Sequence, residues 1–471
     1  MPTELSSPRL ISGPVISHLR ALAIPMALGF AALNSYSIAD TYFVGQLGTL
    51  PLAAMGFTFP VSFAMIAVGL GVGIGTSSVI ARLLGTGDRA TVQRITTHAL
   101  MLSVIFGFFL LVVGLATLEP VFRALGADER TLPLITEYMR VYYLGSMFLI
   151  LPMVGNFAIR ATGDAMVPAV ILGLSAIINV ILDPLLIFGL FGFPRLELQG
   201  AAIATVIANA VTVVASVAVL YWRERLILRR HFRFAELWDS WQRLLHVCIP
   251  ATATNLLIPI TMAVITALVA GFGPEAVAGF GVASRVESAV FIVIFALQSS
   301  VGPFVGQNYG AGQLDRVRQA VSFSTKFLMF YGVVIAAVLF IIARPTAAFF
   351  DDNPLVVDTA TAYLRIVPFT YGTFGMMVIS VGCFNSLGRP MPAAVLTFIK
   401  FFVVYLPLAW GLSILMGLDG IFWATALSHL VFGFVSLLWL RQFLKTLVSG
   451  ESLGGKQMAG IEGVAVVGPI Q

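Results

Sequence analysis

Two carboxylates stand inside long apolar stretches of this 471-residue sequence, where a charged side chain is expensive. Asp40 lies near the end of the apolar stretch 17–45, and Asp183 lies near the end of the stretch 165–190. Placing a carboxylate in a hydrocarbon environment costs about 2.5 kcal/mol or more, so such residues usually mark a path for ions or protons. We therefore predict that Asp40 and Asp183 bind a cation, either H+ or Na+.

Further oxygen-bearing side chains are expected at the same depth. Asn179 is one helical turn before Asp183 and shares its face, and Thr205 lies near the start of the next apolar stretch. Asp40, Asn179, Asp183 and Thr205 thus form a predicted cation-coupling site that suits protons or Na+. Pro184 and Pro25 each remove a helical hydrogen bond, so both are predicted hinges.

Other polar residues of the first half could line the same cavity. They are Asn34, Tyr36, Ser37, Tyr142 and Asn156. Each alone also fits ordinary packing, because Ser and Asn commonly form hydrogen bonds between membrane helices. Asp40 and Asp183 have a structural alternative too, in which they only hold neighbouring helices together.

The elements that position these residues are apolar helices. Hydrophobic residues make up 59% of the chain and charged residues 10%, which indicates that lipid surrounds most of it. We count twelve stretches of the length needed to cross a bilayer, one of them running without interruption over 132–159. The prediction is an all-α polytopic membrane protein with twelve transmembrane helices.

The sequence is also an internal duplication. One constant offset pairs residues of the same type in the two halves: Pro25 with Pro250, Gly87 with Gly312, Tyr138 with Tyr363, and Gly163 with Gly388. At this offset Asp40 falls on Ile265 and Asp183 on Leu408. A structural pair should appear in both copies, so the difference favours a functional role. Six spans per copy predict parallel repeats, forming two pseudo-symmetric lobes with a cleft between them.

The predicted organisation follows from these stretches. It consists of an N-terminal segment 1–16, an N-lobe 17–222, a basic linker 223–244, a C-lobe 245–445 and a disordered tail 446–471. Lys and Arg concentrate in the loops on the side of the termini, which predicts that both termini are cytoplasmic in the inner (plasma) membrane. The linker mixes Arg with Phe and Trp, which suits a helix at the membrane interface or a solvated tether.

The second half carries its own unshared charges. Arg285, Glu287 and Lys400 lie inside predicted spans, and Glu287 and Lys400 fall on Ser62 and Ser175 of the first half. They could form an ion pair that fixes the lobe, or they could contact a transported compound. Both alternatives remain open at this point.

Several functional classes are disfavoured. The sequence lacks the G-x-x-x-x-G-K-[ST] phosphate loop, so ATP hydrolysis is not the expected energy source, and no cofactor or nucleic-acid partner is expected. The glycine-rich stretch 69–76 lies within an apolar span, where it predicts close helix packing. The histidines are scattered without acidic partners, so an intramembrane enzyme is not expected.

The chain resembles the multidrug and toxic compound extrusion (MATE) transporters over about residues 12–445. The resemblance rests on Ile38-Ala39-Asp40-Thr41, on the turn from Gly85 to Arg89 and its partner from Gly310 to Leu314, on Arg160 to Asp164, on Asn179 to Pro184 and on Gly200 to Thr205. The acids of the first half are similar to the prokaryotic branch that includes the DNA-damage-inducible F proteins.

This resemblance implies a function. A protein of that branch would be a secondary antiporter that exports cationic or amphipathic drugs in exchange for H+ or Na+ by alternating access. Asp40, Asn179, Asp183 and Thr205 would then couple the cation, with Tyr142 and Asn156 nearby. The alternative within the superfamily is a flippase for a lipid-linked precursor, which Arg285 and Lys400 favour. A two-lobed unit of twelve spans is expected to work as a monomer.

Overall fold

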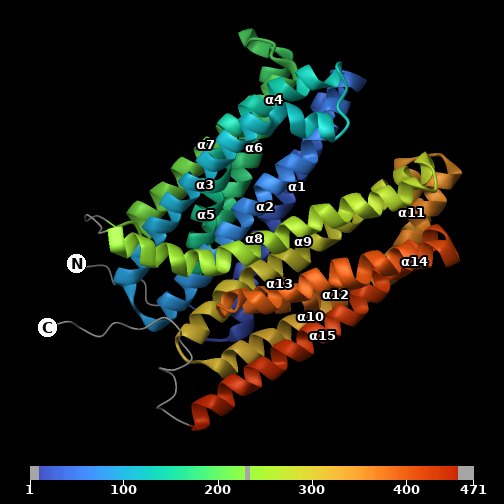
Figure 1. Cartoon of the computed structure of the whole chain (residues 1–471). Coiled ribbons are helices and arrows are strands. Elements are labelled where there is room, and N and C mark those ends of the chain that lie inside the picture. The colour runs from blue at the N-terminus through green and yellow to red at the C-terminus, as the bar shows by residue number, and fades with distance from the viewer. Residues whose placement is uncertain (1–9, 229–233, 454–471) are drawn as a thin grey trace.

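Helices form almost the whole of the described chain, and they gather into two lobes (Figure 1). The computed structural model describes residues 10–228 and 234–453, and within these ranges it contains no β-strand. The N-lobe consists of α1 (Val15–Gly45), α2 (Thr49–Thr86), α3 (Arg89–Ala124), α4 (Thr131–Leu144), α5 (Ser146–Ala161), α6 (Met166–Phe188), η1 (Leu190–Gly192), α7 (Glu197–Ala218) and η2 (Val219–Arg223). The C-lobe consists of α8 (Phe234–Ala270), α9 (Pro274–Gly310), α10 (Leu314–Phe350), α11 (Pro354–Ile366), η3 (Val367–Thr370), α12 (Tyr371–Ser386), α13 (Pro390–Phe398), η4 (Ile399–Tyr405), α14 (Leu406–Met416) and α15 (Leu418–Leu453).

The predicted all-α membrane fold is confirmed, with one difference in its spans. Among the described residues, eleven helical segments are long and apolar enough to cross a membrane, and a bent pair brings the number to twelve. That pair is α4 and α5, which meet at an angle of 47°. The sequence predicted one uninterrupted span over 132–159. The structure breaks it at Gly145, where a Cβ atom would collide with Val206 of α7.

The duplication is visible in the backbone. Gly87 and Gly312 have φ angles of 81° and 71°, and Gly163 and Gly388 have φ angles of 93° and 74°. Each pair occupies equivalent positions of the two copies, at turns where a residue with a Cβ atom would be strained. The two lobes therefore have the same turn conformations at equivalent helix ends, as well as equivalent apolar stretches.

Two predicted boundaries differ from the structure. The linker 223–244 was expected to be a separate segment, but from Phe234 onward it forms the first turns of the long helix α8. These turns dock on α3, where Trp241 donates to the carbonyl oxygen of His98 (3.1 Å) and Arg94 pairs with Asp239 (3.2 Å). The tail was expected to be disordered from residue 446, but α15 continues to Leu453. Residues 1–9, 229–233 and 454–471 lie outside the described part, so the corresponding predictions stay untested.

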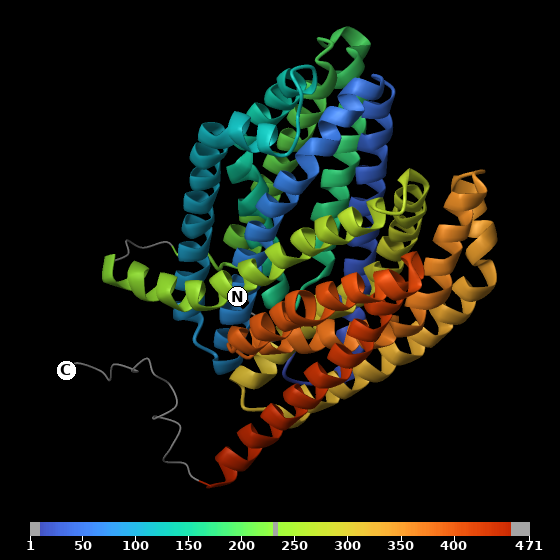
Figure 2. The ribbon, with the colours of Figure 1, turned by 45° about the vertical axis from the view of Figure 1, so that its right-hand side comes forward.

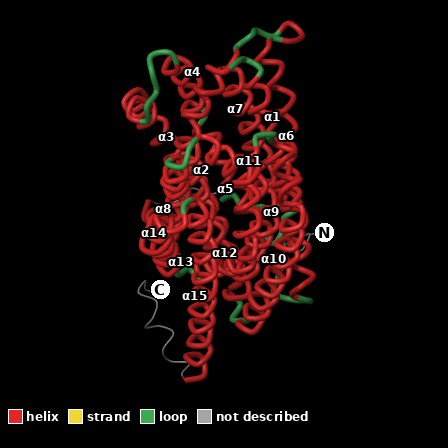
Figure 3. Tube along the Cα trace, turned by 90° about the vertical axis from the view of Figure 1, so that its right-hand side faces the viewer, coloured by secondary structure: helices red, strands yellow, loops and turns green. Residues whose placement is uncertain are grey.

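The two lobes converge near the chain termini and diverge away from them (Figures 1 and 2). Their contact runs along α1 and α2 of the N-lobe and α8 and α9 of the C-lobe. The glycine-rich stretch of α2 supplies part of it, because Cβ atoms on Gly71 and Gly75 would collide with Thr252 and Cys248 of α8. The predicted close packing of this stretch is thus confirmed. Seen from the side, α2 and α9 lie near the middle of the molecule (Figure 3).

A reciprocal contact closes the converging ends. Gln307 of α9 donates through Nε2 to the carbonyl oxygen of Ala161 at the end of α5 (2.7 Å) and accepts from the backbone N–H of Leu10 (3.1 Å). At the equivalent position of the N-lobe, the guanidinium of Arg82 lies against Gly388 of the C-lobe. We call Arg82 and Gln307 the inter-lobe latch, because each reaches from its own lobe to a turn of the other.

The crossing of α2 and α9 gives a stability prediction. Gly85 and Gly310 are equivalent residues, and a Cβ on either would collide with backbone atoms of the other lobe, at Gln307 and Arg82. We expect Gly85→Val and Gly310→Val to cost about 2 kcal/mol or more through overpacking and to lower the Tm by a few degrees. Fluorescence-monitored thermal unfolding in detergent measures this change.

The duplication supplies the matched control for that experiment. Gly56 and Gly281 form another equivalent pair, and outside the adjacent turns of its own helix no atom of the described residues lies within 4 Å of a Cβ on either. Gly56→Val and Gly281→Val should leave the Tm close to that of the unaltered protein. Equal losses of Tm in both pairs would show that the collision is not the cause.

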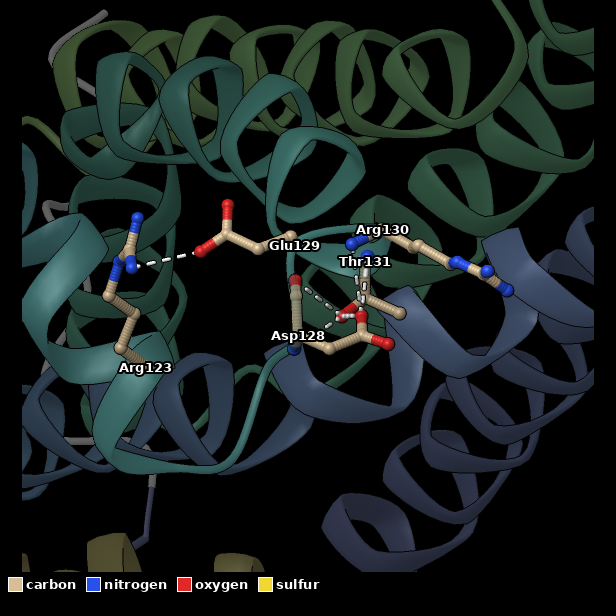
Figure 4. A network of polar contacts seen from close by, with 5 residues as sticks. All are labelled: Arg123, Asp128, Glu129, Arg130 and Thr131. Atoms are coloured by element: carbon tan, nitrogen blue, oxygen red, sulfur yellow. Dashed lines mark hydrogen bonds and ion pairs between the residues drawn. The ribbon is translucent and has the colours of Figure 1, made fainter.

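The turn between α3 and α4 shows how a short loop is held in shape at the diverging end of the N-lobe (Figure 4). Asp128 accepts hydrogen bonds from the Thr131 hydroxyl (2.6 Å) and from the Thr131 backbone N–H (2.8 Å). Both bonds lower the pKa of the exposed Asp128 carboxyl, and the bond from the hydroxyl has the larger effect. Arg123 and Glu129 add an exposed ion pair of 3.0 Å. These contacts fix the residue at which α4 begins, Thr131.

Candidate functional site

The N-lobe brings the two predicted carboxylates together in its interior. Asp40 near the end of α1 is 7% exposed, and Asp183 near the end of α6 is fully buried. They lie close enough to interact electrostatically, because α1 packs along α6. Oδ1 of Asp40 and both carboxylate oxygens of Asp183 have no hydrogen-bond partner within the described residues. Buried oxygens of this kind are costly unless a proton or a cation satisfies them.

The amide and the hydroxyl predicted for this site also meet. Asn179 Nδ2 donates to Thr205 Oγ1 over 3.2 Å, which joins α6 to α7. Asn179 is almost fully buried, and its Oδ1 has no hydrogen-bond partner among the described residues. Because the amide nitrogen faces Thr205, its oxygen remains as an acceptor for a cation. Carboxylate and amide oxygens are the donors that hard cations prefer.

Three tyrosines surround the carboxylates. Tyr36 of α1 lies within electrostatic range of Asp40 and Asp183, and Tyr142 of α4 lies within range of Asp40. Tyr138 belongs to the same group and stacks on Tyr142, with ring centroids 5.9 Å apart. The sequence predicted Tyr36 and Tyr142 but not Tyr138. The signal for Tyr138 in the sequence is its pairing with Tyr363 in the duplication, which also fits a purely structural role.

The remaining predicted residues of the N-lobe are less closely tied to the carboxylates. Asn34 is half-buried and Ser37 is exposed on α1, and the described residues show no hydrogen bond from either side chain to Asp40 or Asp183. Asn156 is buried in α5 with an unpartnered Oδ1. Pro25 and Pro184 both lie within continuous helices, so their role as hinges stays a prediction.

The C-lobe charges do not form an ion pair within the described residues. Glu287 of α9 accepts a 2.9 Å hydrogen bond from the Tyr363 hydroxyl. Lys400 lies in the π-helical segment η4, with Nζ 4.9 Å from the ring centroids of Phe374 and Phe401. Arg285 is exposed on α9. Of the two alternatives left open by the sequence, the direct ion pair is thus absent from the described part of the chain.

The duplication also appears in comparisons with known proteins. The MatE family model matches residues 25–185 and matches again over residues 250–410. The two matches have the same length and the same offset as the repeat in the sequence, and together they cover more than half of the chain. The chain belongs to the MatE family.

Relatives of this MatE protein match it along almost its whole length. A FAD transporter of Shewanella oneidensis is 39% identical over 90% of this chain and 94% of its own length. A probable multidrug resistance protein of Bacillus subtilis, YoeA, is 25% identical over 90% of this chain and 94% of its own length. Family members are transporters rather than enzymes, and relatives with multidrug names support multidrug efflux as the general function.

Solved structures agree with the two-lobed fold of this MatE protein. The Vibrio cholerae MATE transporter VcmN in the bent form has a TM-score of 0.86 and 28% identity, with 92% of this chain and 97% of that chain covered. A multidrug resistance MATE transporter in an outward-facing conformation has a TM-score of 0.88 and 25% identity, covering 94% and 99%. The protein is therefore a polytopic membrane protein of a transporter family.

Proposed function

We propose that this MatE protein is a secondary antiporter that exports cationic or amphipathic compounds in exchange for H+ or Na+. The observation that supports it best is the pair of buried carboxylates in the N-lobe, Asp40 and Asp183, because Asp40 Oδ1 and both oxygens of Asp183 lack hydrogen-bond partners within the described residues. A site of this kind gains stability when it binds a cation, and it has no counterpart in the C-lobe. Cation binding would therefore be coupled to transport through the N-lobe alone.

The mechanism follows from where the lobes meet. In the structure they converge near the termini and diverge at the other side, which is the outer side if the termini are cytoplasmic (Figure 2). Neutralising Asp40 and Asp183 with protons or Na+ would remove the repulsion between them. The helices α1 and α6 could then pack differently, aided by Pro25 and Pro184, and a bound compound would leave outward. The site would work in the inner membrane, in a monomer.

A second candidate substrate is an anionic flavin dinucleotide. The observation in its favour is Lys400, a buried cation in the C-lobe that forms no ion pair within the described residues. The name of the Shewanella oneidensis relative, a FAD transporter, points in the same direction. A lipid-linked precursor would use the same lysine, but the half-buried aromatic residues around Lys400 suit a flat ring better than a polyprenyl chain.

Transport by purified protein in liposomes tests the proposal. We expect ethidium or FAD to accumulate when a pH gradient or a Na+ gradient is imposed, with no accumulation in its absence. Accumulation under the pH gradient alone would identify H+ as the coupling ion, and accumulation under the Na+ gradient alone would identify Na+. Absence of gradient-driven transport of both compounds would contradict the proposal.

A further inference from the structure

The C-lobe contains a buried ammonium group, and no described acidic residue of that lobe pairs with it directly. Lys400 is 1% exposed, and the described residues provide it with neither a hydrogen bond nor an ion pair. Glu287 is close enough to interact electrostatically, but its Oε1 accepts from Tyr363. A desolvated charge of this kind is costly, and the two aromatic faces beside it offset only part of the cost. An anion is the partner that would complete the site.

The charge is not a requirement of the scaffold. At the equivalent positions of the N-lobe, Lys400 corresponds to Ser175 and Glu287 corresponds to Ser62. Lys400 also lies in η4, a π-helical segment between α13 and α14, and such irregularities within α-helices are frequent at functional sites. The same fold is therefore built in the N-lobe without this lysine, so a structural need does not explain it.

Aromatic side chains cover the lysine. Phe291 and Phe374 stack with ring centroids 4.7 Å apart and an interplanar angle of 21°. The rings of Phe374 and His429 have centroids 4.8 Å apart, and the ring centroids of Phe374 and Phe401 each lie 4.9 Å from Lys400 Nζ. Phe291, Phe374 and Phe401 are half-buried, whereas Lys400 is almost completely covered. We call these three residues the aromatic wall. Flat rings stack well on such a surface.

We propose that Lys400 and the aromatic wall form a substrate subsite in the C-lobe for an aromatic compound that carries a phosphate or carboxylate group. The flat ring lies on the aromatic wall, and the anionic group pairs with the ammonium of Lys400. This inference rests on the proposed export function and specifies its substrate class. It places substrate selection in the C-lobe and cation coupling in the N-lobe.

Transport of three compounds that differ in charge and ring provides the test. They are FAD, riboflavin, which has the same flat ring without phosphate, and the cation ethidium. Lys400→Met keeps the length of the side chain without its charge, so we expect it to raise the concentration for half-maximal FAD uptake about tenfold or more. Uptake of riboflavin and ethidium should change less than about twofold, and Lys400→Arg should restore FAD uptake.

The matched control is Lys326→Met, which removes an exposed lysine from α10 of the same lobe. It should leave the transport of all three compounds unchanged. Equal losses for all three compounds in Lys400→Met would indicate a structural lysine and overturn the proposal. Unchanged FAD uptake would overturn it as well.

A binding measurement separates this inference from the proposed function. Quenching of flavin fluorescence by the purified protein in detergent reports FAD binding without any gradient. Binding weakened by Lys400→Met would support the subsite even if no gradient drove transport, whereas gradient-driven ethidium transport without Lys400-dependent FAD binding would contradict the subsite alone. Lys400-dependent translocation of a short-chain polyprenyl pyrophosphate without FAD binding would contradict the aromatic substrate class.

Discussion

Asp40→Asn and Asp183→Asn are each expected to reduce gradient-driven export by about tenfold or more while substrate binding persists. The asparagine side chain has nearly the same shape as aspartate, but it neither takes up a proton nor balances the charge of Na+. Because coupling is a difference in cation affinity between two conformations, losing one carboxylate removes about 1–3 kcal/mol of it. Uptake into liposomes under the coupling gradient, measured beside equilibrium binding of the same compound, checks both halves of the expectation.

Glu137→Gln is the matched control for these variants. Glu137 is an exposed acid on α4 of the same lobe. Its replacement should leave transport and binding unchanged. Full gradient-driven transport by Asp40→Asn or Asp183→Asn would show that the site does not couple the cation.

Removal of the inter-lobe latch is expected to open the converging ends of the two lobes. Gln307→Ala deletes the hydrogen bond to Ala161, which joins the two lobes, and the bond from the N–H of Leu10, a residue whose carbonyl oxygen is held by Asn308 and Arg316 of the C-lobe. A hydrogen bond of this kind stabilises the closed arrangement by about 0.5–1.5 kcal/mol, so losing the Ala161 bond should raise the ratio of open to closed molecules about two- to thirteenfold. Spin labels at Ala90 and Asp315, which are exposed near these ends of the two lobes, report the change as a longer distance.

The label experiment needs a background without native thiols, and Cys248 and Cys383 are both free. Gln93→Ala is the control variant, because Gln93 donates to Arg225 within the N-lobe and does not cross between lobes. It should keep the short distance. If Gln307→Ala also kept it, the latch would not determine which side of the protein is closed.

Much of the fold could be predicted from the sequence, because its signals are strong and local. Long apolar stretches give the helices, and the constant offset between copies gives the two lobes. The break at Gly145 was missed, since a single glycine in an apolar stretch resembles ordinary packing until Val206 is placed beside it. The start of α8 was missed for a similar reason, because its contacts with His98 and Arg94 come from a distant helix.

The candidate site was predictable where a charged residue stands in an apolar stretch. Asp40 and Asp183 stand out because charge is rare in apolar stretches, whereas Tyr138 does not, since tyrosine is common in membrane helices. The latch escaped prediction because Arg82 and Gln307 occupy equivalent positions but differ in type. Lys400 was noted as a charge, but the rings that cover it come from different segments, α12 and η4, so only the structure assembles them.

The most direct test of the account is whether substrate and cation compete within one molecule. Purified protein in weakly buffered detergent solution is mixed with ethidium or FAD, and released H+ is followed with a pH indicator while bound radioactive Na+ is followed in parallel. The account predicts that substrate releases one of these cations from the unaltered protein and releases none from Asp40→Asn or Asp183→Asn. Substrate binding that releases neither cation from the unaltered protein, with an affinity independent of pH and Na+, would contradict it.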